Sequence, residues 1–531
     1  MLGTIIEKEL KSIILSPKFV ATFAACSILI LLSVWVGIQD YQASVEQYEA
    51  ALKLNQQALS ERNWAGFATS AYRPPDPMQI FVSGVNNDIG RLSSISRAAD
   101  VKLRNSIYSD DPIFAVFRFV DLTFIVQIVL SLFAILFTYD AVNGEREGGT
   151  LALTFANPVP RAHFILGKFA GSWLGLVIPL AIPILLSMLL VMLSGVPMTP
   201  AHWQKVAMLM GAALLFFTFF LCFGVLVSSL TRRSAVSFLL SLVAWVVLVL
   251  IIPRMGVMAA GQSIQVPSMA EIESMQEGFA QSRWDEYKNE AQERWKERMS
   301  QTQGLSAEER TVANKQKMQQ WMLEDSQFRA KVQEEIAAYQ RRLTEERRNQ
   351  LALQESLALT LARVSPAAAF QLTAMTLADT DIYLKARAED TMRTYRDEVL
   401  ELAEEKAGKQ GDAMGHAMSF SFTTRTPPEK VSDEDGSSDG SGSSGSSDPS
   451  GSSSGDSGGG SAKPGAFRMS FSGGGAESPT LDPAEVPAYT PPDRTLEAAL
   501  APSILDLGLL ALYSLAAFAA AFLAFLRYDV R

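Results

Sequence analysis

Apolar residues gather in six long runs along the chain, separated by segments rich in charged and small polar residues. A helix needs roughly 20 mostly apolar residues to cross a bilayer, because lipid offers no partners for backbone polar groups. Each of the six runs satisfies this condition. The predicted spans are residues 18–38, 119–138, 164–193, 206–229, 234–252 and 504–526.

Basic residues indicate which side of the membrane each connection occupies. Loops on the cytoplasmic side carry an excess of Lys and Arg near the span ends. The short connection 194–201 has no basic residue, so we assign it to the opposite side. We therefore expect a multi-pass protein of a bacterial-type cytoplasmic (inner) membrane with both termini in the cytoplasm. The residues on the basic side are Lys8, Lys11, Lys18, Arg146, Arg161, Lys168, Arg232, Arg233, Arg527 and Arg531.

Two long polar segments, residues 39–113 and 253–503, are then expected outside the cytoplasm. The second begins with a helical domain, residues 253–431, in which Ser268-x-x-Glu271 and Ser306-x-x-Glu309 are helix-start patterns. Apolar stripes follow both patterns and a glycine separates them, which predicts an antiparallel helical hairpin. The second helix would be about 85 Å long if it were unbroken, and we expect a break within it.

The end of the outer segment differs in character from the hairpin. An apolar stretch, residues 367–377, is expected to form a helix that lies flat against the outer leaflet. Residues 432–480 are mostly Ser, Gly and Asp, which predicts a disordered linker, and residues 481–503 lead to the last span. The predicted fold class is an all-α polytopic membrane protein with six transmembrane helices, an extracytoplasmic helical hairpin domain and a disordered Ser/Gly/Asp tether.

Composition narrows the classes of function. The chain has 531 residues, of which 48% are hydrophobic and 19% charged, with a net charge of −10. This balance argues against a nucleic-acid partner, because such proteins present a basic surface. Two cysteines and three histidines are too few for a disulfide framework or a multi-histidine metal centre.

The nearest approach to a metal site is the group Met414, His416 and Met418. Thioether and imidazole groups suit Cu(I). Three such residues in a flexible polar stretch make a poor site, so no bound metal is predicted. A membrane-anchored Cu(I) chaperone stays open as an alternative function.

The predicted cytoplasmic parts are small. Residues 1–17 begin with an amphipathic helix, and residues 139–163 form the largest cytoplasmic loop. The chain has no G-x-x-x-x-G-K-[ST] phosphate loop. We therefore predict that the chain is not an enzyme, that it binds no cofactor directly, and that any energy it uses comes from a partner.

The most specific motifs of the chain lie in and around this loop. It contains EREGGTL at residues 145–151 and NPVPR at residues 157–161, and Gly167-Lys168 opens the third span. LVSSLTRR follows the fourth span at residues 226–233. These motifs resemble those of ABC-2-type transporter permease subunits. The resemblance is closest to the branch with large extracytoplasmic insertions, which is related to the nitrous oxide reductase copper-assembly and multicopper enzyme maturation permeases.

The resemblance implies a transmembrane permease subunit that moves an unidentified substrate, with export expected, using ATP hydrolysed by a separate ABC ATPase subunit. It also implies a homodimer or heterodimer of permeases in the lipid bilayer. A short helix with Glu145 and Glu147 at the surface would dock on the ATPase; the alternative is an ordinary solvated turn. The residues expected to couple the ATPase to the spans are Glu145, Arg146, Glu147, Gly149, Thr150, Pro158 and Arg161.

Small residues mark one face of the third span. Gly167, Gly171 and Gly175 recur every four residues, which lets a second helix approach closely. That helix is predicted either within the same subunit or across a dimer. Asp506 is a polar residue inside the last span and is expected to bond to a neighbouring helix.

A second class of function remains open. The long exported hairpin favours a mechanical transmitter, in which the same ATPase moves the hairpin against an envelope partner and no substrate crosses. The six-span core favours transport.

Overall fold

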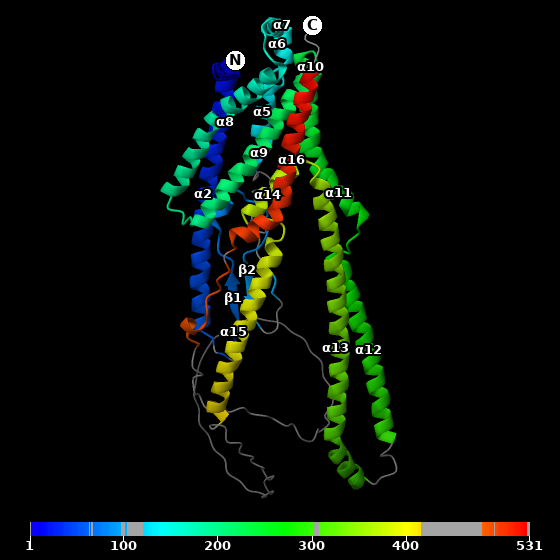
Figure 1. Cartoon of the computed structure of the whole chain (residues 1–531). Coiled ribbons are helices and arrows are strands. Elements are labelled where there is room, and N and C mark those ends of the chain that lie inside the picture. Colours follow the sequence, from blue (N-terminus) through cyan, green and yellow to red (C-terminus); the bar gives the residue numbers. More distant parts are fainter. Residues whose placement is uncertain are drawn as a thin grey trace, which may run out of the picture.

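The protein is a bundle of helices from which two arms extend (Figure 1). The computed structural model describes residues 2–527 except 63, 65–66, 97–100, 104–120, 301–306, 416–480 and 493. The predicted linker 432–480 therefore lies outside the described residues. His416 and Met418 also lie outside them, and Met414 lies in the last turn of a helix.

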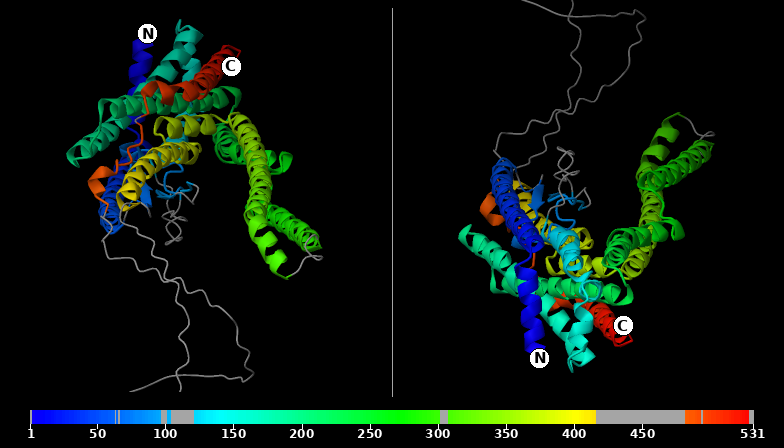
Figure 2. Two further views of the ribbon diagram at one scale, coloured as in Figure 1. Left: turned by 90° about the horizontal axis from the view of Figure 1, so that it is seen from below. Right: turned by 90° about the horizontal axis from the view of Figure 1, so that it is seen from above.

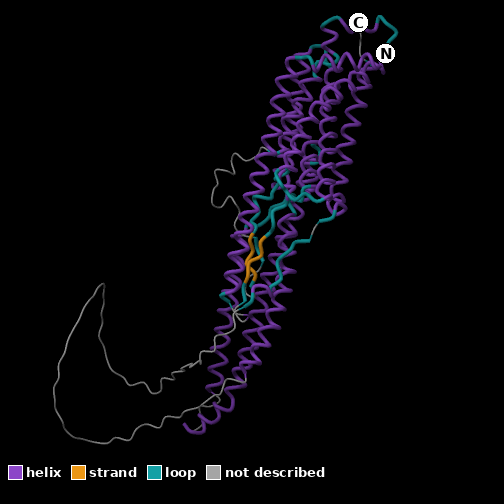
Figure 3. Tube along the Cα trace, turned by 90° about the vertical axis from the view of Figure 1, so that its left-hand side faces the viewer, coloured by secondary structure: helices purple, strands orange, loops and turns teal. Residues whose placement is uncertain are grey.

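Within the described residues, six helical segments are long and apolar enough to cross a membrane. This confirms the predicted all-α polytopic membrane fold. Helix α1 and the end of α16 lie at the same end of the bundle (Figures 1 and 3). The bundle helices are α1 (Leu2–Ile14), α2 (Pro17–Ser60), α4 (Leu122–Phe124), α5 (Ser131–Thr138), α6 (Asn143–Glu147), α7 (Thr150–Phe155), α8 (Arg161–Leu193), α9 (Pro200–Leu230), α10 (Ser234–Trp245), α11 (Ile252–Ser263), α14 (Pro366–Leu377) and α16 (Leu496–Leu526).

The first span belongs to a helix much longer than a bilayer requires. Ser16 caps α2 by accepting the Phe19 N–H at 3.2 Å, and Pro17 occupies the first helical position, where its missing N–H costs nothing. The helix then continues for 44 residues. Its second half leaves the bundle and forms one wall of the first arm (Figure 1).

The first arm, which we call the outer module, joins parts of the chain that are far apart in sequence. The second half of α2 packs with β1 (Thr69–Tyr72), β2 (Leu92–Ile95), α15 (Leu384–Gly415) and the short turn η6 (Pro483–Glu485) (Figure 2). The two strands pair antiparallel. The core residues include Leu59, Trp64, Phe67, Ile95, Met392, Val399 and Leu481.

The second arm is the predicted hairpin, formed by α12 (Met269–Ser300) and α13 (Ala307–Ala362). The rings of Phe279 and Tyr339 stack between the two helices with centroids 4.0 Å apart. The expected break is wrong, because α13 runs unbroken for 56 residues. Helix α11 supports the part of α13 nearest the bundle, where the Gln354 side chain donates to the Ile264 carbonyl at 2.7 Å.

Helix α14 contradicts the expectation of a helix lying flat on the outer leaflet. It is buried in the bundle between α9 and α16 (Figure 1). Phe370 stacks on Phe216 of α9 with ring centroids 4.9 Å apart, and both side chains are buried. A helix that is apolar on all sides belongs inside a protein, and the alanines of α14 let its neighbours approach closely.

Two π-helical turns, η4 (Ile125–Leu130) and η5 (Val246–Ile251), interrupt the second and fifth spans beside α14. Such turns leave backbone groups out of the regular helical pattern. The hydroxyl of Ser365, which caps α14, donates to the Leu248 carbonyl of η5. Trp245 donates to Ser131 Oγ at 2.7 Å and joins the two spans. The start of α14 is thus fixed to the fifth span.

Replacing Phe370 with Ala should lower the free energy of unfolding by about 3 kcal/mol, because the change leaves a cavity against Phe216. Thermal unfolding of the purified protein in detergent measures the effect. Val364→Ala is the control, since that side chain is 60% exposed and should tolerate truncation. Equal melting temperatures for the two variants would contradict the buried position of α14.

Candidate functional site

The predicted coupling residues lie at the end of the bundle where α1 begins and α16 ends. We call this end the inner platform. It consists of α1, α6, α7, the first turns of α8 and the turn between α9 and α10 (Figure 1). The loop between the second and third spans therefore lies beside the connection between the fourth and fifth spans.

Helix α1 lies along the glycine stripe at the start of α8. Added Cβ atoms at two of the glycines would come closer to α1 than real Cβ atoms approach other atoms, so a larger residue there would push α1 away. The partner of this stripe is therefore a helix of the same chain. The Cβ positions at Gly167, Gly171 and Gly175 lie 2.7, 2.5 and 3.5 Å from Ile5, Glu9 and Ile13.

Lys168 joins α1 and α6 to α8. Its side chain is 5% exposed, and its Nζ lies 2.7 Å from Glu9 Oε1 and 2.6 Å from Glu145 Oε1. Lys8 adds a further ion pair to Glu145 at 2.6 Å. A buried ammonium is tolerated only when carboxylates pair with it. We call Glu9, Glu145 and Lys168 the lysine clasp.

The end of α9, the turn after it and the start of α10 contact α6 on the side away from Lys168. Ser228 Oγ donates to Asn143 Oδ1 at 3.2 Å, and the amide of Asn143 donates to Thr231 Oγ1 at 2.9 Å. Glu147 accepts the Ser234 N–H at 3.0 Å and its hydroxyl at 2.6 Å. The motif that follows the fourth span thus positions the loop before the third.

Other predicted coupling residues stabilise the loop itself. Gly149 has φ = 71° and begins α7, a backbone conformation that suits glycine. Thr150 Oγ1 donates to the Glu145 carbonyl at 3.1 Å. Arg161 donates to the Leu526 carbonyl at 2.7 Å, so it joins the start of α8 to the end of α16.

Helix α7 and the turn after it lie at the tip of the inner platform (Figure 1). Leu153 is 68% exposed although it is apolar, and Asn157 and Pro158 beside it are exposed. Arg146 is half-buried. The tip of α7 thus presents an apolar side chain to its surroundings beside exposed polar residues.

The structure turns Glu145 away from the expected surface display, whereas Glu147 is exposed at the surface as expected. Both carboxylates are used within the chain, and the Glu145 side chain is only 11% exposed. The reason is the buried Lys168, which requires carboxylate partners. Sequence reasoning also missed Glu9, although a charged residue between Ile5 and Ile13 on the apolar face of α1 was a usable signal.

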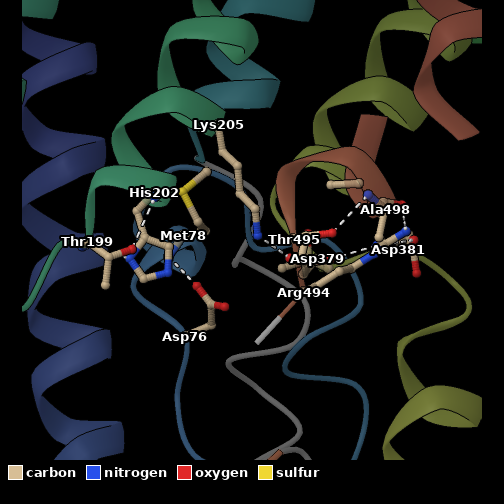
Figure 4. Close-up of polar contacts among 12 residues, drawn as sticks. Asp76, Met78, Thr199, His202, Lys205, Asp379, Asp381, Arg494, Thr495 and Ala498 are labelled. Atoms are coloured by element: carbon tan, nitrogen blue, oxygen red, sulfur yellow. Dashed lines mark hydrogen bonds and ion pairs between the residues drawn. The ribbon is translucent and has the colours of Figure 1, made fainter. Parts of the chain in front are cut away.

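A second polar group lies away from the inner platform, at the start of α9 and just past the end of α14; Figure 4 shows its contacts. Asp379 accepts Lys205 of α9 at Oδ2 and Arg494 at Oδ1, each at 2.6 Å. We call Lys205, Asp379 and Arg494 the outer ionic cluster. Beside it, Arg387 pairs with Asp381 at 2.8 Å.

Asp76 lies at the edge of the outer ionic cluster and points toward the ring of His202 (Figure 4). Burial raises the pKa of Asp76, and the Met78 N–H, His202 and Lys205 act in the opposite direction. His202 also caps α9, because its Nδ1 accepts the Thr199 N–H at 3.1 Å. These contacts attach the segment between β1 and β2 to the start of α9.

Asp506 has the helix partner that its position in a span predicted. Its Oδ1 lies 2.6 Å from Nε of Arg363. Arg363 is the first residue after the end of α13. No group of three His, Cys, Asp or Glu side chains suitable for a metal is present in the part of the chain described. The Met414, His416 and Met418 candidate therefore stays an untested prediction.

The hairpin carries a groove of about 770 Å³ between α12 and α13. Tyr287, Trp295 and Trp321 line it together with Arg298 and Arg329. The Trp295 side chain is 54% exposed. Aromatic and arginine side chains of this kind dominate protein-binding surfaces.

Replacing Lys168 with Met should lower the free energy of unfolding by about 3 kcal/mol, because it leaves Glu9 buried without its cation. Adding Glu9→Gln should restore part of the loss. Thermal unfolding of the purified variants measures both effects. Lys11→Met removes an exposed ion pair of the same helix and should leave the melting temperature unchanged. A Lys168→Met protein as stable as the control would contradict the clasp.

The protein is 31% identical over 125 residues to the Probable ABC transporter permease protein NosY of Stutzerimonas stutzeri, a match that covers 23% of this chain and 45% of the relative. It is 44% identical over 57 residues to the protein of the same name from Pseudomonas aeruginosa, which covers 11% of this chain and 21% of that relative. The chain thus spans less than half the length of the curated relatives it matches.

A sequence family described as "ABC-2 family transporter protein" matches residues 3–385. The match begins in α1, contains the whole inner platform and ends after α14. It covers more than half of the chain, so this multi-pass membrane protein belongs to the ABC-2 family of transporter proteins.

Proposed function

We propose that the chain is the permease subunit of an ABC transporter and exports a substrate with ATP hydrolysed by a separate ATPase subunit. In this proposal the inner platform faces the cytoplasm of a bacterial cell, and two permeases associate in the inner membrane. The chain itself catalyses no reaction. Family membership and the six apolar helices support the membrane role.

The lysine clasp is the observation that carries the proposal. A force applied to α6 or α1 acts on α8, because Glu145, Glu9 and Lys168 share one buried set of ion pairs. The same loop acts on α9, α10 and α16 through Asn143, Glu147 and Arg161. An ATPase that binds the exposed tip of α7 would therefore move several spans together, as a transport cycle requires.

Leu153→Arg should abolish co-purification of the cognate ATPase and its stimulation by the permease. The reason is that a charge at the exposed tip of α7 would disrupt an apolar docking contact. Co-expression, affinity purification through the permease and an ATPase assay measure both quantities. Leu54→Arg is the matched control, since Leu54 is 65% exposed on α2 in the outer module, at the other end of the molecule.

We expect the Leu54→Arg protein to retain the ATPase. If Leu153→Arg retained it equally well, the docking role of α7 would be wrong. If the wild-type permease captured no protein with a phosphate loop, the proposed function as a whole would fail.

The mechanical transmitter remains a second candidate, and the aromatic groove of the hairpin favours it. A groove on a projecting arm suits an envelope partner better than a substrate path through the bundle. The two candidates differ in what the distal hairpin contributes. In a transporter the hairpin is dispensable for flux, whereas in a transmitter it delivers the output.

Replacing residues 284–331 by a short glycine-containing turn separates the two candidates. The change removes the groove and retains the Phe279–Tyr339 stack and the Arg283–Glu335 ion pair, so the shortened hairpin keeps its own packing. We expect ATPase stimulation to remain and the cellular phenotype of the intact gene to persist. Loss of that phenotype with normal ATPase stimulation would instead support the transmitter.

A further inference from the structure

Helix α14 occupies the space between the spans in the half of the bundle nearest the arms. It contacts α9, α16 and the two π-helical turns, and Thr373 and Ala374 on it are fully buried. Any aqueous route that reaches the outer side between α9 and α16 has to displace this helix. The position of α14 therefore decides whether such a route is open.

The two ends of α14 are held in different ways. At its start, Ser365 donates to the Leu248 carbonyl of the fifth span. Past its end, Asp379 has φ = 56°, a left-handed conformation that among residues with side chains only Asn and Asp adopt with any frequency. The backbone carbonyl of the next residue, Thr380, accepts a hydrogen bond from the Val85 N–H at 3.0 Å.

We propose that the outer ionic cluster is a latch that positions α14 in the closed state of the permease. Asp379 follows α14 directly, Lys205 belongs to α9, and Arg494 precedes α16. One carboxylate therefore connects the end of α14 to both of its neighbours, α9 and α16. When α9 and α16 move apart, at least one of the two ion pairs has to break.

The surroundings of the outer ionic cluster provide a second arrangement. Arg494 lies 2.6 Å from Asp379 and 3.7 Å from Asp381, so a small shift exchanges one carboxylate for the other. The guanidinium then stays paired while Asp379 is released. The Lys205 side chain is 4% exposed, forms an ion pair with Asp379 and also interacts electrostatically with Asp76, so the closed arrangement holds its buried charge beside two carboxylates. Two discrete pairings of this kind suit a switch better than a static brace.

This inference rests on the proposed function, and a cysteine reporter tests it in the complex of full-length permease and ATPase in proteoliposomes. Thr373→Cys places a thiol in the buried face of α14, and the native Cys26 and Cys222 are each only 1% exposed. The probe is a membrane-impermeant maleimide added on the side of the arms. Its labelling rate is measured without nucleotide and with ATP and vanadate.

With the latch intact, we expect slow labelling without nucleotide and faster labelling with ATP and vanadate. Asp379→Asn should label at least tenfold faster without nucleotide, a change that corresponds to about 1.4 kcal/mol. Asn tolerates the left-handed backbone, so the substitution removes mainly the charge. Lys205→Met should have the same effect, and Lys205→Arg should preserve slow labelling.

Two controls separate a latch from general loosening. Lys406→Gln breaks a pair with Glu485 that lies 3.0 Å away in the outer module, and labelling of Thr373→Cys should stay slow. Met392→Cys reports on the core of that module and should stay protected in the Asp379→Asn protein. Fast labelling of Met392→Cys would mean that Asp379 only stabilises the fold, which would overturn the latch.

The outcomes also distinguish the latch from the proposed function. If nucleotide accelerates labelling of the Thr373→Cys protein with an intact cluster, but Asp379→Asn and Lys205→Met added to it label slowly without nucleotide, the latch is wrong and coupling stands. If nucleotide has no effect on the Thr373→Cys protein with an intact cluster while both added substitutions give fast labelling, the ionic cluster closes α14 but the coupling to an ATPase fails.

Discussion

The ion pairs of Lys168 are the constraint on which the inner end of this protein depends. An ammonium group that is only 5% exposed needs carboxylate partners, and it takes them from α1 and α6. That requirement turns Glu145 inward and fixes the loop before the third span. It also places α1 against the glycine stripe of α8. The sequence of this loop is that of a charged connection between spans, but its ion pairs and hydrogen bonds fix it to the bundle.

The opposite end follows the same principle with different residues. Asp379 accepts one cation from α9 and another from the segment before α16, and Asp506 accepts Arg363 at the end of α13. Each carboxylate joins segments that are more than 100 residues apart in sequence. Charge pairs therefore add to the continuous helix α2 and to the α11–α13 contact in joining the arms to the spans, and such pairs can change partners without the loss of an apolar core.

Between the two ends, apolar side chains pack the helices of the bundle against one another. Helix α14 fills the space beside α9 with Phe370 and several alanines, and the π-helical turns of the second and fifth spans adjoin it. An irregular backbone is tolerated at membrane depth when protein groups satisfy it, as Ser365 does at Leu248. A signal from the inner platform would reach α14 through spans whose helical pattern is already interrupted beside it.

The sequence by itself determined the number of spans, the hairpin and the family, because these depend on local features: long apolar runs, helix-start patterns and contiguous motifs. It also marked Gly171 and Asp506 as contact residues without naming their partners. Only the tertiary structure decided that Glu9 meets Lys168, that α14 is buried, and that Asp379 joins Lys205 to Arg494. Those contacts join residues far apart along the chain. Their partners are chosen by which charges the packed helices leave buried, and no local pattern records that choice.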